Sequence, residues 1–160
     1  MVLKEAPVSF DPRLRNATFM GRVAQRAYPE AEMIAKSEAG RAWVSNVRPE
    51  EIKVDIDSEY CNHVSERAAI ILRSEGITTK THKLLSPWPD WVSHAFLTAN
   101  DSFLIDFQYR QFVEPELKAG LPDYIAAPYQ NRKDIFDLLT KHRVREDVYH
   151  YWTIPLFGAV

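Results

Sequence analysis

The sequence predicts an α+β fold in which helices pack against an antiparallel β-sheet. Three segments carry this prediction: a helix from about Cys61 to Arg73, a β-hairpin formed by Val92–Thr98 and Ser102–Phe107, and a helix over Lys133–His142. Both hairpin strands have apolar residues on both faces. Strands of that kind belong to a sheet that is covered on two sides.

Length and composition indicate one globular domain. The chain has 160 residues and a formal net charge of -2, with 46% hydrophobic and 26% charged residues. These values are ordinary for a soluble protein. We expect a helical lead-in over residues 1–50, a core over 57–112, and a C-terminal helix and strand over 113–160. The balanced charge gives no support to a nucleic-acid partner.

The chain shows no signal for membrane insertion or general export. No apolar stretch approaches the ~20 residues of a membrane span, and the opening MVLKE has no signal-peptide core. A single cysteine fits a reducing compartment, since it has no disulfide partner in its own chain. We therefore expect folding in the cytoplasm. Secretion into a target cell by a specialised system, which reads no such signal, stays open.

The periodicity of apolar residues predicts the remaining elements. Apolar residues from Phe19 to Ile34 are interrupted by Pro29, so two short helices are expected there. The helix that begins near Cys61 has its apolar residues at spacings of three and four and ends before Gly76. Residues 77–85 are expected to form a strand, and residues 148–154 a last strand.

Cys61 stands where the chain enters that helix. A thiol attacks as its thiolate, and an ordinary cysteine has a pKa of roughly 8.5. The unsatisfied N–H groups of a helix N-terminus favour negative charge, and they can bind the oxyanion of a tetrahedral intermediate. The alternative is an inert buried thiol, because cysteine is among the most buried residue types. Taken alone, Cys61 fits the inert role slightly better.

His94 and Asp106 change that balance. Each lies inside an apolar strand, where an imidazole or a carboxylate needs a partner. A three-residue turn centred on Asn100, with Asn100 or Asp101 in a left-handed conformation, would place them directly opposite each other on one face. A two-residue turn would separate them onto opposite faces. A purely structural His–Asp pair is the alternative interpretation.

A metal site is the weaker hypothesis for these residues. Cys61, His63, His82 and His94 could in principle bind zinc, but no CxxC or HxxxH spacing supports them. We expect no metal and no cofactor.

Three short motifs together resemble a known superfamily. They are Cys61-x-x-Val64-Ser65, His94-Ala95-Phe96-Leu97, and Leu104-Ile105-Asp106 followed by Gln111-Phe112. Residues 57–112 thereby resemble the papain-like cysteine enzymes, particularly the transglutaminase-like and bacterial toxin or effector deamidase members. The resemblance implies a papain-like fold, with the nucleophile's helix packed against an antiparallel sheet and flanking helices. It also implies Cys61 as nucleophile, His94 as general base and acid, and Asp106 as the residue that orients His94.

One departure from that family concerns the oxyanion donors. Papain-type proteases have a glutamine shortly before the cysteine, and none occurs in residues 53–60. The backbone N–H of Cys61 would act with a second donor, for which Ser58 and Asn62 are the candidates. Gln111 is either a substrate-groove residue or a structural one.

The resemblance implies attack on a carboxamide and a thioester intermediate. We expect a glutamine deamidase acting on a protein substrate, for example a protein of a host or target cell, in a groove that Trp88 and Trp91 wall. These tryptophans could equally pack over the sheet. A protease or transglutaminase of the same fold is the first alternative. A catalytically inert binding module is the second, and a Cys61 sulfur far from the His94 ring would favour it.

Overall fold

The computed structural model describes residues 11–42, 61–85 and 93–159. Its helices are α1 (Ala17–Ala42), α2 (Cys61–Ser74), α3 (Arg132–Lys141) and α4 (His150–Phe157). Its strands are β1 (Thr79–Leu85), β2 (Ser93–Ala99), β3 (Phe103–Asp106) and β4 (Ile125–Pro128). They form a four-stranded antiparallel sheet in the order β1-β2-β3-β4. The predicted α+β class is confirmed.

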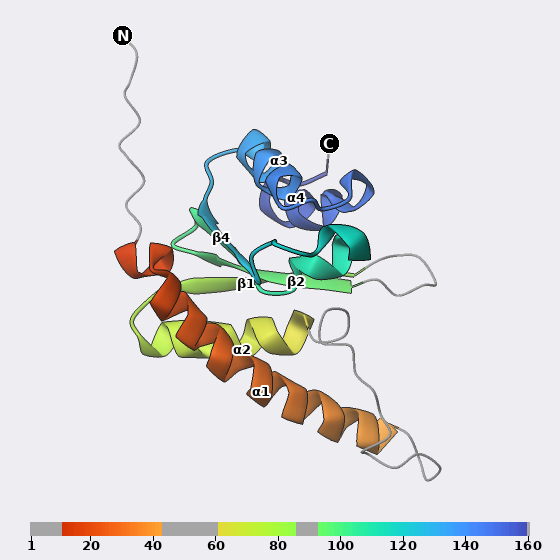
Figure 1. Ribbon diagram of the computed structural model, residues 1–160. Helices are drawn as coiled ribbons and strands as arrows, with labels where there is room; N and C mark the ends of the chain where they lie inside the picture. The colour runs from red at the N-terminus through yellow and green to blue at the C-terminus, as the bar shows by residue number, and fades with distance from the viewer. Residues whose placement is uncertain (1–10, 43–60, 86–92, 160) are drawn as a thin grey trace.

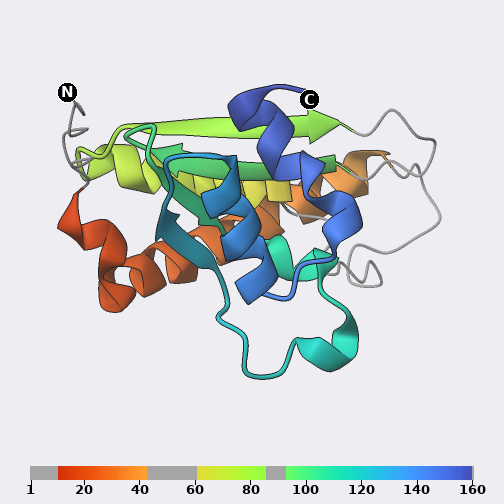
Figure 2. The same cartoon turned by 90° about the horizontal axis from the view of Figure 1, so that it is seen from above.

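The helices lie on both faces of the sheet. Figure 1 shows α1 and α2 below it and α3 and α4 above it, and the view from above in Figure 2 shows α3 and α4 crossing the strands. Short 3₁₀ helices occupy Pro12–Arg15, Tyr109–Phe112, Pro115–Leu117 and Glu146–Val148. None of the helices in the described ranges is long and apolar enough to cross a membrane.

Strand alternation divides the core into two clusters. On the α1–α2 side, Leu97, Ala99, Phe103 and Ile105 pack against apolar residues of the two helices. On the α3–α4 side, Phe96 and Leu104 pack with residues that include Ile135, Leu139, Tyr151 and Trp152. Because successive strand residues point to opposite faces, His94 and Asp106 belong to the α3–α4 side.

Helix α2 confirms the predicted helix. Val64, Ala68 and Leu72 have no exposed area and form its buried face. The helix ends where Gly76 adopts a positive φ of 80°, which glycine does without steric cost. The backbone N–H of Ile77 then donates to the carbonyl of Leu72 at 3.0 Å, so the end has the closed form typical of a glycine stop.

The predicted break at Pro29 is wrong, because α1 continues through it. Met20, Val23, Ala27 and Ala31 are all buried in the cluster that α1 shares with α2. They form one stripe that runs past the proline on both sides. Packing of this stripe against α2 outweighs the missing backbone hydrogen bond at Pro29.

The β2–β3 hairpin has a different register from the predicted one. Ala99 pairs with Phe103 and Leu97 with Ile105, so the three-residue loop is Asn100–Ser102 rather than a turn centred on Asn100. Asn100 and Asp101 both have positive φ, 54° and 53°. The predicted direct opposition of His94 and Asp106 is therefore wrong. The odd loop length nevertheless keeps both residues on one face, as diagonal neighbours.

The predicted strand over residues 148–154 is also wrong. This part of the chain forms the end of a 3₁₀ helix and most of α4. Tyr151, Trp152 and Thr153 are consecutive and all buried, and a short run that is apolar all round has no period to separate helix from strand. Strand β4, which the sequence did not predict, completes the sheet beside β3.

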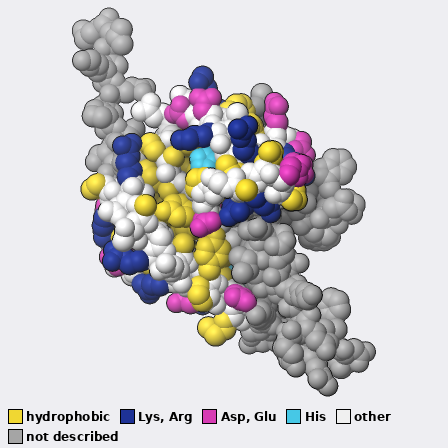
Figure 3. All heavy atoms as spheres, in the orientation of Figure 1, with side chains coloured by type: hydrophobic (Ala, Val, Ile, Leu, Met, Phe, Trp, Pro, Cys, Tyr) yellow, Lys and Arg dark blue, Asp and Glu magenta, His cyan; other side chains and the backbone are white. Residues whose placement is uncertain are grey.

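The face shown in Figure 3 combines apolar and charged side chains. Hydrophobic side chains form a band down its middle, and Lys, Arg, Asp and Glu lie on either side. The exposed large hydrophobic residues in the described ranges are Met33, Ile70, Leu117 and Phe136. They come from separate elements, as single exposed apolar residues commonly do.

Candidate active site

His94 and Asp106 form a buried pair near the ends of adjacent strands. The ring Nε2 of His94 lies 2.6 Å from Oδ2 of Asp106, and neither side chain has exposed area. A directly opposed pair would have its Cβ atoms only about 4.5–5.5 Å apart. The diagonal arrangement suits the length of the imidazole, because it brings the far ring nitrogen to the carboxylate.

The Asp106 carboxylate accepts two further hydrogen bonds. The backbone N–H of Gln108 donates to Oδ1 at 2.8 Å, and the indole Nε1–H of Trp152 donates to Oδ2 at 2.6 Å. A buried carboxylate is tolerated only when it is paired and hydrogen-bonded. These three donors from β2, α4 and the segment after β3 meet that requirement.

The environment of His94 favours its charged form. Burial by itself would lower the pKa of His94, but the charge of Asp106 and its hydrogen bond, together with a hydrogen bond to Cys61, raise it to about 9. The ring is therefore an imidazolium at neutral pH. In that state Nε2–H donates to Asp106, which leaves Nδ1–H directed at the remaining partners.

Cys61 is the first residue of α2, it is buried, and its side chain is among the groups that raise the pKa of the His94 ring. It reaches the ring from the α1–α2 side of the sheet. In the described ladder β2 pairs with β3 only from Leu97 to Ala99, so His94 has a ladder partner on β1 and none on β3. One turn further along α2, the Ser65 hydroxyl donates to the carbonyl of Ala95 at 3.1 Å. This bond fixes the start of the helix to the strand residue next to His94.

Gln111 meets the other side of the same ring. Its amide Nε2 lies 2.9 Å from Nδ1 of His94. An amide nitrogen donates to a neutral ring, whereas a protonated Nδ1 requires the amide oxygen, which a half-turn of the side-chain amide provides. Because Nε2 is engaged by Asp106, Nδ1 is the ring nitrogen available to both Gln111 and the thiol.

The remaining predicted site residues are not brought together in this way. Ser58, Trp88 and Trp91 lie outside the described residues. Asn62 is half-buried, and its Oδ1 is buried with no hydrogen-bond partner among the described residues. That atom is an acceptor, so it gives no support to Asn62 as an oxyanion donor.

Trp152 and Gln108 are the site residues that sequence reasoning missed. Trp152 lies 46 positions after Asp106, in a segment predicted to be a strand. The sequence feature that could have pointed to them is Asp106 itself, since a buried carboxylate has more lone pairs than one histidine can satisfy. A search for further buried donors would have considered the indole N–H groups.

A second buried histidine lies on the neighbouring strand. His82 Nε2 is 2.8 Å from the Thr98 hydroxyl, and burial lowers the pKa of His82 to about 4. His142 follows α3, where its Nδ1 is 2.7 Å from the Leu138 carbonyl. Within the described residues no group of three acidic, histidine or cysteine side chains could hold a metal ion.

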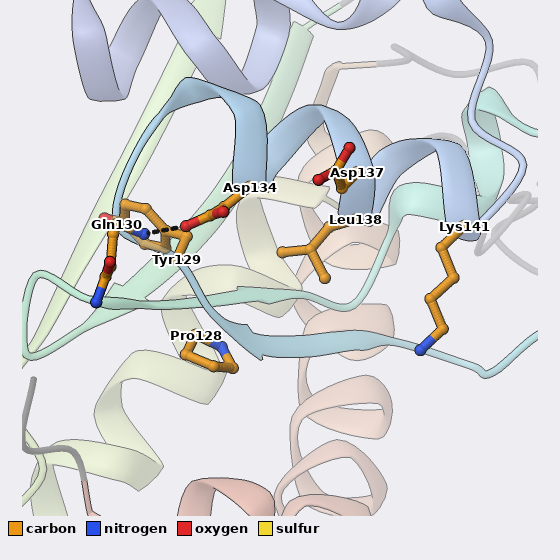
Figure 4. Close-up of a pocket in the computed structure, with 7 residues that line it drawn as sticks. All are labelled: Pro128, Tyr129, Gln130, Asp134, Asp137, Leu138 and Lys141. Carbon is orange, nitrogen blue, oxygen red and sulfur yellow. Dashed lines mark hydrogen bonds between the residues drawn. The ribbon is translucent and has the colours of Figure 1, made fainter. Parts of the chain in front are cut away.

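A groove of about 370 Å³ lies away from this centre, between the end of β4 and α3. Figure 4 shows Tyr129 and Gln130 at one end and Lys141 at the other, with Asp134 accepting a 2.8 Å hydrogen bond from the Gln130 backbone N–H. None of the predicted site residues lines this groove.

Comparisons with known protein families, curated proteins and solved structures find no match for the chain.

Proposed function

We propose that the protein is a cysteine-dependent amide hydrolase with Cys61 as nucleophile, His94 as general base and acid, and Asp106 as the orienting residue. One observation carries the proposal: the buried His94 ring lies 2.6 Å from the Asp106 carboxylate, and the buried Cys61 side chain acts on the same ring. The position of Cys61 at the start of a helix packed on an antiparallel sheet supports the papain-like arrangement that the motifs imply.

The reaction follows from the protonation state of this chain. The Cys61 thiolate attacks a carboxamide carbon and forms a C–S bond, which gives a tetrahedral oxyanion. The oxyanion collapses, the C–N bond breaks, and the His94 imidazolium gives its proton to the leaving nitrogen. Neutral His94 then takes a proton from water as the water attacks the thioester. The carboxylic acid leaves and the Cys61–His94 ion pair is restored.

The oxyanion requires preorganised donors. The first backbone N–H groups of an α-helix have no partner within the helix, and α2 begins at the nucleophile itself. The N–H of Cys61 is therefore the primary donor in this proposal. The positive end of the α2 dipole stabilises the same negative charge.

The proposed substrate is a glutamine side chain of a protein, with ammonia as the leaving group. The motif around Asp106 and Gln111, which resembles that of effector deamidases, supports deamidation. The same triad chemistry also serves proteolysis and transamidation. A peptide bond in place of the side-chain amide gives proteolysis, and an amine in place of water gives transamidation.

The inert binding module is the weaker candidate. It has no need for an ionised buried pair beside the only cysteine of the chain, because such a pair contributes little net stability compared with apolar packing. The interaction of Cys61 with the His94 ring favours the enzyme.

Alkylation of Cys61 tests the proposal while the substrate is still unidentified. Because the chain has one cysteine, a single iodoacetamide adduct in the intact mass reports on Cys61 alone. At pH 7 the wild type should react faster than His94→Gln, because the His94 imidazolium favours the thiolate that attacks the reagent. His82→Gln is the matched control, since it removes a buried imidazole from the adjacent strand.

Mass spectrometry of candidate substrate proteins then distinguishes the reactions. A glutamine-to-glutamate mass change identifies deamidation, a cleaved chain proteolysis, and a mass increase from an added amine transamidation. Cys61→Ala should abolish each of them while the protein stays folded. Alkylation of the wild type that is unaffected by His94→Gln would contradict the enzyme proposal.

A further inference from the structure

We infer that Trp152 is a positioning residue of the proposed hydrolase, whose indole N–H holds the Asp106 carboxylate in place for His94. This inference rests on the proposed function and goes beyond the Cys61, His94 and Asp106 set. It makes the C-terminal helix α4 part of the active site.

The geometry at one oxygen atom carries the inference. The indole N–H of Trp152 and Nε2–H of His94 both donate to Oδ2 of Asp106, each at 2.6 Å. The other oxygen, Oδ1, accepts from the backbone N–H of Gln108. That backbone bond alone would allow the carboxylate to rotate about it. A second fixed donor on Oδ2 sets the direction in which Asp106 presents its charge to the ring.

Trp152 also limits the movement of the imidazole. Its ring centroid lies 4.7 Å from that of His94, tilted by 56°. Phe112 contacts both rings, at 5.2 Å from Trp152 and 4.9 Å from His94, in edge-to-face arrangements. Trp152 and Asp106 have no exposed area. No side-chain rotation can therefore replace the indole N–H with a water molecule without opening this cluster.

The choice of residue type fits this role. A phenylalanine would supply similar apolar packing but would leave Oδ2 of a buried carboxylate with one donor fewer. Buried tryptophans commonly use their single N–H for a specific partner. Here that partner is the charged residue of the triad, 46 positions earlier in the chain.

Trp152→Phe tests the inference because it keeps an aromatic side chain and removes the N–H. Tyr151→Phe is the matched control: it is an aromatic substitution at the adjacent buried position of α4, stacked on Phe112. The measurement is an NMR titration of the His94 ring in histidine-labelled protein. Without the indole donor the carboxylate can turn away from the ring, so we expect the pKa of His94 to fall by up to about one pH unit in Trp152→Phe. Tyr151→Phe should titrate like the wild type.

The wild type provides a second measurement if Trp152→Phe fails to fold. The indole N–H resonance of Trp152 should change with pH at the same apparent pKa as the His94 ring, since both donate to one oxygen. An unchanged pKa of His94 in Trp152→Phe would overturn the inference. An indole N–H resonance that does not change with pH as the His94 ring titrates would overturn it too. These outcomes are separate from those of the alkylation experiment, which tests the enzyme proposal through Cys61.

Discussion

His82 and His94 lie on adjacent strands of the same sheet face and have opposite electrostatics. Both are buried, and both rings stack on Phe96, at centroid distances of 5.0 Å and 6.0 Å. The pKa of His82 is lowered to about 4 and that of His94 is raised to about 9. The main difference is the partner on Nε2, which is the Thr98 hydroxyl for His82 and the Asp106 carboxylate for His94.

The comparison shows that burial of a histidine does not by itself indicate chemistry. Burial disfavours the imidazolium in both positions, and only a buried negative charge reverses the outcome. A histidine in an apolar strand is therefore a weak functional signal. A carboxylate in the neighbouring strand, on the same face, is the stronger one.

Asp106→Asn should have the largest effect, because it removes that charge with little change of shape. His94 should then behave as His82 does, with its pKa below the ordinary 6.5 rather than near 9. Turnover of a substrate should fall by roughly 10²–10⁴-fold, the usual contribution of general acid–base catalysis. NMR titration of His94 and the pH profile of Cys61 alkylation measure the change. An alkylation profile identical to that of the wild type would refute the role assigned to Asp106.

Thr98→Asp should give His82 the partner that His94 has. A carboxylate near His82 Nε2 should raise its pKa from about 4 to above the ordinary value of 6.5. The His82 ring titration measures this shift. Thr98→Val is the control, since it removes the hydroxyl without adding charge and should leave the His82 pKa low.

The two histidines should affect stability in opposite pH ranges. The folded-state pKa of His82 lies below 6.5, so its contribution is present above pH 6.5 and is lost as the pH falls through about 4. The folded-state pKa of His94 lies above 6.5, so its contribution is present below pH 6.5 and is lost as the pH rises through about 9. Urea unfolding of His82→Phe should therefore show a flatter acid side than the wild type. An equally steep acid side would contradict the neutral burial of His82.

Gln111→Leu should have the smallest effect. The Gln111 amide nitrogen faces Nδ1 of His94 and stabilises the neutral ring when it donates. Its removal should therefore raise the pKa of His94. The rise should be less than about one pH unit, because a half-turn of the amide lets the wild-type Gln111 oxygen accept a hydrogen bond from the charged ring as well. The ring titration used for Asp106→Asn measures this. A fall in the pKa of His94 would show that Gln111 acts mainly through its oxygen.

The sequence supported the local elements of the site better than its long-range contacts. The helix from Cys61 follows from apolar spacing and a glycine stop, and the shared face of His94 and Asp106 follows from strand alternation with an odd loop. Which three residues form that loop did not follow, because Asn100 and Asp101 both tolerate left-handed backbone.

Trp152 could not be identified from the sequence. Its helix carries apolar residues all round, and its contact with Asp106 depends on how α4 packs over the sheet. The continuity of α1 through Pro29 is similar, since it depends on buried alanines that meet α2. In both cases tertiary packing decides what local patterns leave open.

The Asn100–Ser102 loop restricts which insertions and deletions related sequences can tolerate at this turn. Surface turns usually accept insertions and deletions freely, but a single added or lost residue here would shift β3 by one position against β2 and turn its side chains to the other face. Asp106 would then point toward α1 and α2, away from His94. Homologous chains that retain the pair should differ in length at this turn by even numbers of residues, so the spacing between the histidine and the aspartate should keep its parity.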